Sequence, residues 1–219
     1  RVILCAALAS GAVDPDPIDS AILGGRGIAE ARAAYRVTHF LPFDPVSKRA
    51  EAAVAGPGGA AFKVTKGAPQ VILSLDPDLD RLRPPVEEAV NAFARRGFRS
   101  LGVARADEKG RWRFLGVIPL YDPPREDSRA TLESARRMGI RVKMLTGDNL
   151  AIAKEIAGQL SLGPNILDSS LLAGVEHLRT PELAARIEEA DGFAQVFPEH
   201  KYYIVDALQK QGHIVGMTG

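Results

Sequence analysis

The sequence contains one cysteine and no long apolar run, and each shortage excludes a class of protein. Cys5 stands alone among 219 residues, which excludes an internal disulfide and predicts a small apolar side chain in a reducing compartment. The four histidines are scattered, without the ligand spacing of a metal site. No apolar run approaches the roughly 18 residues of a membrane-spanning helix, and no signal-peptide pattern is present. We therefore expect that this polypeptide itself spans no bilayer.

Net charge is also nearly missing, because 28 basic and 27 acidic residues leave a formal charge of +1. No overall field favours nucleic acid or an acidic membrane surface, so nucleic acid is not an expected partner and any anion site must be local. A P-loop is absent too, because the glycine clusters at 24–27 and 56–59 have neither its spacing nor its lysine. If the chain binds a nucleotide, it does so without a P-loop.

The composition that remains is that of a globular protein, with 46% hydrophobic and 25% charged residues, enough for one large or two modest domains. The pattern of the sequence changes near Tyr121-Asp122-Pro123, where we place a domain boundary. Before it, turn-rich stretches separate strand-like runs at Lys63–Thr65, Arg99–Ala104 and Trp112–Leu120, which predicts an antiparallel sheet with helices. Pro84–Arg96 is predicted to be a helix that starts at its prolines and stops at the glycine that follows.

The second half alternates helices with strands. Such alternation predicts a parallel sheet with crossover helices, in which ligands bind at the carboxyl ends of the strands. Thr146-Gly147-Asp148 and Thr218-Gly219 are expected to lie at such ends. The predicted elements are a helix capped by Asp127 or Ser128 and ended by Gly139, a strand at 140–145, a helix after Asp148, a helix at 199–211 and a buried strand at 213–217.

Two features of the second half suit a phosphate group. Thr146-Gly147-Asp148 offers a hydroxyl and bare backbone N–H groups at a strand-to-helix junction, although the same residues could form a capped turn with Asp148 as the N-cap. Lys201 lies near the start of a helix, where the macrodipole disfavours a cation unless an anion is nearby. Plain solvent exposure of Lys201 is the alternative.

Two features of the first half suit a flat, charged ligand. Lys66-Gly67 places a cation beside a glycine at a strand end, where a backbone can approach a ligand closely. Phe43 lies a few residues from Lys48 and Arg49, so an adenine could stack on its ring for roughly 1–3 kcal/mol. The alternative is a core phenylalanine beside surface cations.

Five segments of the chain form an ordered series: Phe43-Asp44-Pro45-Val46-Ser47-Lys48-Arg49, Lys66-Gly67-Ala68-Pro69, Asp122-Pro123-Pro124-Arg125, Lys143-Met144-Leu145-Thr146-Gly147-Asp148-Asn149 and Met217-Thr218-Gly219. They resemble the successive signature segments of P-type ATPases. The sequence between them, at 39–43, 118–121 and 196–202, is most similar to the plasma-membrane proton pumps. The resemblance covers essentially the whole chain.

The resemblance implies an α/β chain of two parts: a nucleotide-binding domain at 1–119, with an antiparallel sheet and helices, and part of a haloacid-dehalogenase-like phosphorylation domain at 120–219, with a parallel sheet. In the family, adenine stacks on the phenylalanine that Phe43 matches. The other residues that match nucleotide contacts are Asp19, Lys48, Lys66, Gly67 and Arg99, with Asp122 and Arg125 at the hinge. The residues that match the phosphate-side group are Thr146, Gly147, Asp148 and Lys201.

The chemistry that the resemblance implies is attack of an aspartate on the γ-phosphoryl group of ATP, assisted by Mg²⁺. The nucleophile segment Asp-Lys-Thr-Gly-Thr is not in this sequence and is expected upstream of Arg1, and the Mg²⁺ ligands are expected beyond Gly219. We therefore predict a chain that binds nucleotide without forming a phosphoenzyme, and a parallel sheet with an unpaired edge. The expected partners are the transmembrane and actuator domains of the same pump, with this chain on the cytoplasmic side of the membrane.

Two other classes remain open. A free-standing haloacid-dehalogenase-type phosphatase requires an Asp-x-Asp pair after a first strand, whereas Asp14-x-Asp16, Asp76-x-Asp78 and Asp78-x-Asp80 all lie in turn-like, proline-rich sequence. A non-catalytic interaction module is the other class, and it predicts no selectivity for ATP.

Overall fold

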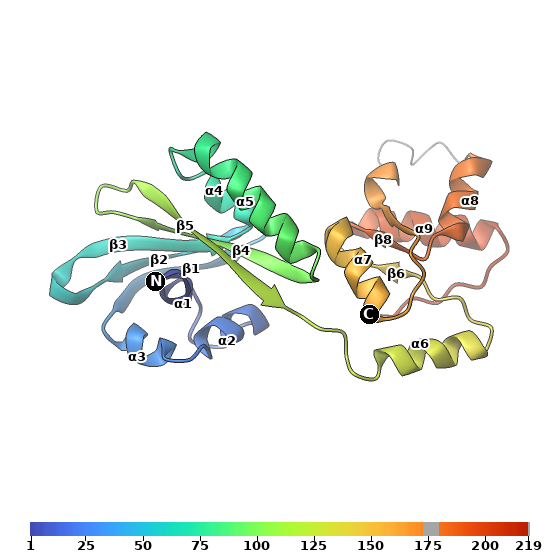
Figure 1. Ribbon diagram of the computed structural model, residues 1–219, viewed down its shortest axis with the longest axis horizontal. Helices are drawn as coiled ribbons and strands as arrows, with labels where there is room; N and C mark the ends of the chain where they lie inside the picture. Colours follow the sequence, from blue (N-terminus) through green and yellow to red (C-terminus); the bar gives the residue numbers. More distant parts are fainter. Residues whose placement is uncertain (173–179, 219) are drawn as a thin grey trace. The chain divides into compact units, whose positions relative to one another are not determined.

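The computed structural model describes residues 1–172 and 180–218, and within them the chain divides into two compact units (Figure 1). Unit 1 consists of Arg1–Phe93 and Phe98–Tyr121. Unit 2 consists of Ala94–Gly97 and the chain from Asp122 onward. None of the helices in the described residues is long and apolar enough to cross a membrane. That the two units are domains with separate functions stays a prediction.

Unit 1 is built on a five-stranded antiparallel sheet in the order β1-β2-β3-β4-β5. Each strand pairs with the next one along the chain, so the sheet is a meander, and the three strands predicted from the sequence are confirmed. The strands are β1 (Arg36–Asp44), β2 (Arg49–Ala55), β3 (Ala61–Gly67), β4 (Phe98–Ala106) and β5 (Trp112–Tyr121).

Helices cover both faces of this sheet (Figure 1). Three lie on one face: α1 (Val2–Leu8), α2 (Pro17–Leu23) and α3 (Ile28–Ala33). On the other face lie α4 (Pro69–Leu73) and α5 (Leu79–Ala94).

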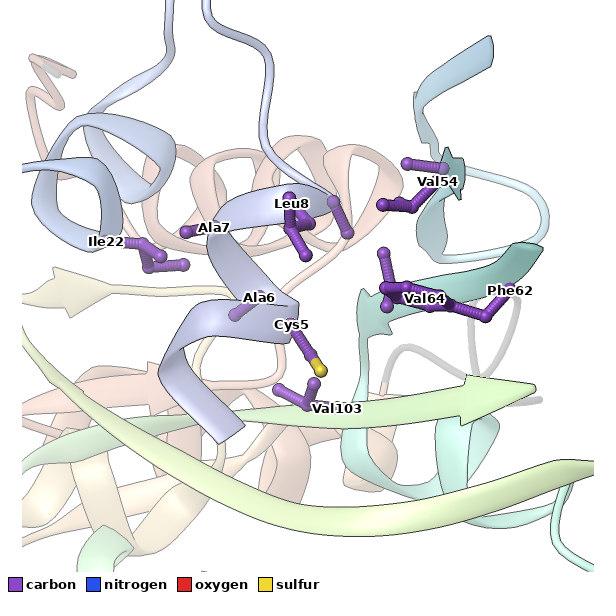
Figure 2. Close-up of a cluster of buried hydrophobic side chains, with 11 residues drawn as sticks. Cys5, Ala6, Ala7, Leu8, Ile22, Val54, Phe62, Val64 and Val103 are labelled. Carbon is purple, nitrogen blue, oxygen red and sulfur yellow. The ribbon is translucent and has the colours of Figure 1, made fainter. Parts of the chain in front are cut away.

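The core of unit 1 lies between α1 and the sheet (Figure 2). Cys5 and Leu8 of α1 are buried against Val64 and Val103 of the central strands. Cys5 is a free, buried thiol, and its burial raises its pKa. Small residues on α1 allow the helix to approach the strands closely, and full burial of a leucine such as Leu8 contributes roughly 1.5–3 kcal/mol.

The predicted helix at 84–96 is correct in kind and wrong at its start. Helix α5 begins at Leu79, because the Asp78 carbonyl already accepts the N–H groups of Arg81 and Leu82 and so closes a first turn upstream of the two prolines. The helix ends at Ala94, and Gly97 then adopts a φ of +77°, which a residue with a Cβ disfavours.

Unit 2 contains a parallel sheet of three short strands in the order β6-β8-β7, which confirms the predicted α/β architecture. The strands are β6 (Met144–Leu145), β7 (Ile166–Asp168) and β8 (Gly192–Ala194). The helices around them are α6 (Ser128–Arg137), α7 (Leu150–Gln159), α8 (Pro181–Glu189) and α9 (Pro198–Lys210). Asp127 is the N-cap of α6, and Gly139, with φ +78°, follows its end as predicted.

The central strand β8 separates two apolar layers. Phe193 packs with residues of α8 and α9, including Ile187 and Ile204, whereas the next residue, Ala194, packs with Ala153 and Ala157 of α7. Successive residues of a strand point to opposite faces, so α7 covers one face and α8 with α9 covers the other.

Two predicted strands of unit 2 need correction. The strand expected at 140–145 is limited to Met144–Leu145, because β6 finds a partner only in β8 among the described residues and pairs with it over two positions. The run 213–217 is not a strand: no ladder pairs it within the described chain, and Ile214 is fully exposed. Thr218 therefore does not follow a strand, and Gly219 lies outside the described residues.

Candidate functional site

Unit 1 contains a pocket of about 570 Å³ between the α2 region, the end of β1, the start of β2 and the end of β3. Its wall includes five residues that the sequence analysis assigned to nucleotide binding, from three separate segments of the chain. They are Asp19, Phe43, Lys48, Lys66 and Gly67.

Phe43 lies near the end of β1 and leaves 57% of its surface exposed, so the alternative of a core phenylalanine does not hold. An exposed ring on a pocket wall is a platform on which a flat base can stack. The turn that follows is rigid, because the Asp44 carboxylate accepts the N–H groups of Val46 and Ser47, at 3.2 and 2.8 Å. These bonds, chiefly the one from Ser47, lower the pKa of Asp44.

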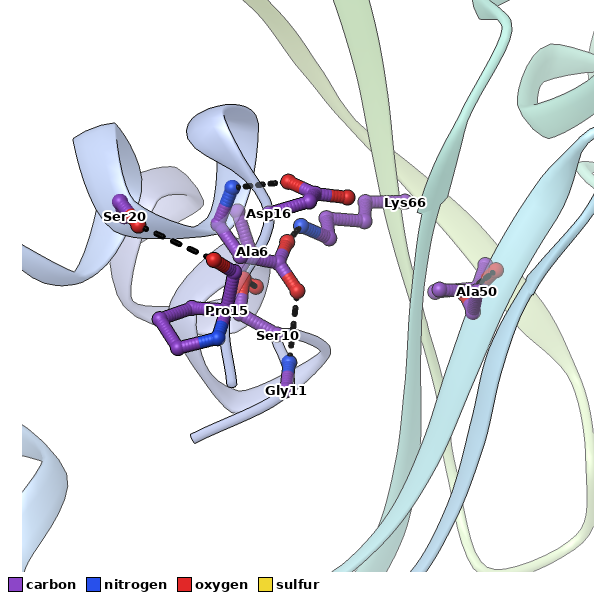
Figure 3. A network of polar contacts seen from close by, with 10 residues as sticks. Ala6, Ser10, Gly11, Pro15, Asp16, Ser20, Ala50 and Lys66 are labelled. Atoms are coloured by element: carbon purple, nitrogen blue, oxygen red, sulfur yellow. Dashed lines mark hydrogen bonds and ion pairs between the residues drawn. The ribbon is translucent and has the colours of Figure 1, made fainter. Parts of the chain in front are cut away.

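Lys66 forms a buried ion pair with Asp19 of α2 (Figure 3). Only 6% of the lysine side chain and 11% of the aspartate side chain are exposed. Lys66 lies on the same face of β3 as Phe62 and Val64, because alternate residues of a strand share a face, and α2 covers its end. Asp19 also accepts the N–H of Gly11 at 2.7 Å, so the carboxylate links three segments of the chain.

Gly67 is required by the chain itself. A Cβ at this position would collide with the Lys48 carbonyl and would lie 2.8 Å from the Arg49 Cα. Lys48 has a φ of +54°, and its carbonyl accepts the N–H of Ala68 at 3.1 Å. The close approach expected at Gly67 is therefore made by neighbouring backbone at the pocket wall, which accounts for the glycine without a ligand.

Sequence analysis missed Ser100, which also lines the pocket. Its Oγ is buried and has no hydrogen-bond partner within the part of the chain that the structure describes. A buried hydroxyl without a partner costs free energy, and a bound polar group would relieve that cost. The sequence offers no signal for it, because a serine inside a strand is unremarkable.

Three predicted nucleotide contacts are not part of this wall. Arg99 lies on β4 with its surface exposed and is absent from the residues that line the pocket. Asp122 and Arg125 are exposed in the segment between β5 and α6, which belongs to unit 2.

In unit 2, Thr146-Gly147-Asp148 follows β6 at the carboxyl edge of the parallel sheet, where the fold predicts ligands. The Thr146 hydroxyl donates to the Asp148 carboxylate at 2.9 Å and accepts the Asp148 N–H at 3.1 Å. The N-cap of α7 is Asn149, whose side chain accepts the N–H of Ile152 at 3.0 Å, so the alternative with Asp148 as N-cap is wrong. Gly147 is exposed.

Lys201 lies in the first turn of α9 with its side chain exposed. The segment from β8 to α9 pairs with the Thr146 loop, because the Val196 N–H donates to the Thr146 carbonyl at 2.9 Å. Phe197, the N-cap of α9, accepts the Lys201 N–H at 3.2 Å. The four predicted phosphate-side residues thus come from two adjoining segments.

Comparison with known proteins decides the family of this parallel-sheet unit. Residues 103–219, more than half of the chain, match the family described as haloacid dehalogenase-like hydrolase. The chain belongs to the haloacid dehalogenase-like hydrolases. Members of this family generally use Mg²⁺. Among the residues that the structure describes, no three His, Cys, Asp or Glu side chains are grouped so that they could hold a metal ion, and we assign no magnesium ligand here.

This haloacid dehalogenase-like chain is 50% identical over its whole length to a protein of Methanocaldococcus jannaschii that is provisionally named a cation-transporting ATPase. It spans only 28% of the length of that relative. The relative's name specifies no particular ion, so the comparison supports a likeness to cation-transporting ATPases and does not support the narrower expectation of a proton pump.

Proposed function

We propose that this chain is the ATP-handling part of a P-type cation-pumping ATPase, with the nucleotide held in the pocket of unit 1. One observation carries the proposal: residues from three separate segments, chosen from the sequence as nucleotide contacts, line one pocket of about 570 Å³. A volume of this size lies within the range of pockets for small molecules and cofactors.

Several residues of the pocket wall have a physical role in this proposal. The exposed ring of Phe43 provides the stacking face for adenine, and Lys48, exposed beside it, provides positive charge for the phosphates. Lys66 is already paired with Asp19, so its positive charge is largely neutralised and its first role is to hold α2 at the pocket wall. Ser100 contributes a hydroxyl to the same wall.

For unit 2 we propose a role in phosphoryl transfer, with Thr146, Gly147, Asp148 and Lys201 around the transferred group. Lys201 supplies positive charge and Thr146 a hydrogen bond to the phosphoryl oxygens. The sequence contains no Asp-Lys-Thr-Gly-Thr segment. We therefore propose that these 219 residues bind nucleotide without forming the aspartyl phosphate. In the whole pump, transmembrane and actuator domains would couple the reaction to a cation, which the resemblance alone suggests is the proton.

The phosphatase alternative fits the family match but is not better supported than the pump. Asp76 and Asp78 lie in the turn before α5 and brace β5: Asp76 accepts the N–H of Phe114 at 2.7 Å, and Asp78 pairs with Arg113 at 2.7 Å. No Asp-x-Asp pair in the described chain follows a parallel strand.

Calorimetric titration with ATP, with and without Mg²⁺, tests the proposal. We expect saturable binding with a Kd of about 0.1–1 mM, equivalent to about −5.5 to −4.1 kcal/mol. Phe43→Ala should abolish it. A folded wild-type chain that gives no binding signal at an ATP concentration several times the highest expected Kd would contradict the proposal. It would favour the interaction module.

A further inference from the structure

Gln195 has an unusual backbone conformation at the carboxyl edge of the parallel sheet. It directly follows the central strand β8 and has a φ of +56°. For a residue with a Cβ this left-handed conformation is unfavourable by roughly 1–2 kcal/mol, and it persists only where the surroundings enforce it. Such residues gather at functional sites.

Three hydrogen bonds hold Gln195 in this conformation. Its N–H donates to the Asp148 carbonyl at 2.8 Å, and its own carbonyl accepts the hydroxyl of the buried Ser169 at 2.6 Å. Its side-chain amide donates to the Asp168 carboxylate at 2.7 Å. Asp168 and Ser169 are at the carboxyl end of β7, so this one residue ties the ends of all three strands together.

One hydrogen bond of Gln195 and one of its neighbour Val196 end on the loop that carries the proposed phosphate ligands. The Asp148 carbonyl is fixed by Gln195, and the Thr146 carbonyl is fixed by the next residue, Val196, at 2.9 Å. A glycine would adopt the same φ without strain, but it could not reach Asp168. The glutamine side chain therefore contributes a hydrogen bond to Asp168 that a glycine with the same backbone conformation would lack.

We propose that Gln195 is a positioning residue for phosphoryl transfer: braced by Asp168 and Ser169, it fixes the Thr146-Gly147-Asp148 loop at the carboxyl edge of the sheet, where the loop meets the phosphoryl oxygens. This inference rests on the phosphate-side role proposed for unit 2. It does not depend on ATP binding in unit 1, because Gln195 and the loop both belong to unit 2.

A charge exchange tests the pairing on this chain. Gln195→Glu sets a carboxylate against Asp168 and breaks the side-chain bond by repulsion. Asp168→Asn supplies an amide, so in the double variant the new amide can donate to the new carboxylate and the bond is restored with its direction reversed. Gln209→Glu adds the same charge at an exposed position of α9 and is the control.

The readout is the NMR shift of the Gly147 and Asp148 amides on titration with inorganic phosphate, whose Kd at such a site is expected at about 1–20 mM. Gln195→Glu should raise the Kd at least about fivefold, the double variant should return it to within about twofold, and Gln209→Glu should leave it unchanged.

Three results would overturn the proposal. One is a wild-type loop that does not respond to phosphate, and another is an unchanged Kd in Gln195→Glu. The third is a loss in Gln195→Glu that the double variant fails to restore, because the side-chain bond to residue 168 would then not be what positions the loop. The first result would leave the ATP titration of unit 1 as a separate question.

Discussion

Replacing Lys66 by methionine should destabilise unit 1 far more than the same change at Lys63. Both lysines lie on β3, three positions apart, and therefore point to opposite faces of the sheet. Lys66 is buried against Asp19, whereas Lys63 reaches Glu51 at 3.1 Å with 56% of its side chain exposed. Removing Lys66 leaves the Asp19 carboxylate buried without its countercharge.

The expected cost follows from the burial of the pair. Removing one partner of a buried ion pair costs about 3–5 kcal/mol. Because Asp19 keeps its hydrogen bond from the Gly11 N–H at 2.7 Å, we expect the lower end of this range. Exposed pairs such as Lys63–Glu51 contribute about 0.2–1 kcal/mol, so Lys63→Met should cost less than about 1 kcal/mol.

Urea unfolding measures both variants through one probe, because Trp112 is the single tryptophan and lies on β5 of unit 1. At a slope of about 1–2 kcal/mol per molar urea, the midpoint should fall by about 1.5–3 M for Lys66→Met. Adding Asp19→Asn should recover part of this loss by removing the uncompensated charge. Equal midpoints for Lys66→Met and Lys63→Met would refute the reasoning. A loss of ATP binding in a Lys66 variant is therefore informative only where the variant is shown to be folded.

Three further predictions concern two glycines and one acid. Gly67→Ala should lower the stability of unit 1 by about 1–3 kcal/mol in urea, because its Cβ would meet the backbone of the next strand. Gly158→Ala, inside α7 with open space around the new methyl, should raise the stability of unit 2 by about 0.5–1 kcal/mol, and a loss there would contradict the packing described. The hydrogen bond from His213, at 2.9 Å, lowers the pKa of Glu188 below its ordinary 4.5, so the stabilising contribution of this acid is present above pH 4.5 and is lost as the pH falls through the lowered value. NMR titration of Glu188 should show its pKa rising in His213→Ala, which removes the donor, and an unchanged pKa would exclude this contact as the cause.

Local patterns in the sequence were enough to predict part of the regular structure, whereas elements such as α1, β1 and β8 were not predicted. The strand at 112–120 and the helix stop at Gly97 follow from a short β-like run between turn-rich stretches and from the backbone freedom of glycine. The errors at predicted strands arose because a strand forms only where a second strand pairs with it. The apolar run at 213–217 has the composition of a buried strand, yet a strand needs a neighbour with which to pair, and none pairs with it in the described chain.

The candidate site likewise has features that the sequence could predict and features that it could not. An exposed Phe43 beside Lys48 could be expected from the chain order of the motifs. The pairing of Lys66 with Asp19 could not, because it joins residues of β3 and α2 that only the folded sheet brings together. The strained Gln195 was also missed, since its φ is imposed by Asp148, Asp168 and Ser169 from two other segments.

An NMR titration with ATP on the wild-type chain, Phe43→Ala and Val46→Ala tests the central claim most directly. Val46 follows Phe43 in the same turn and is 89% exposed, but it does not line the pocket, so its variant controls for changes in the turn. We predict saturable shifts at Phe43, Lys48 and Gly67 in the wild type and in Val46→Ala, and none in Phe43→Ala. Shifts that persist in Phe43→Ala, or that cluster away from these residues, would contradict the assignment of the pocket as the nucleotide site.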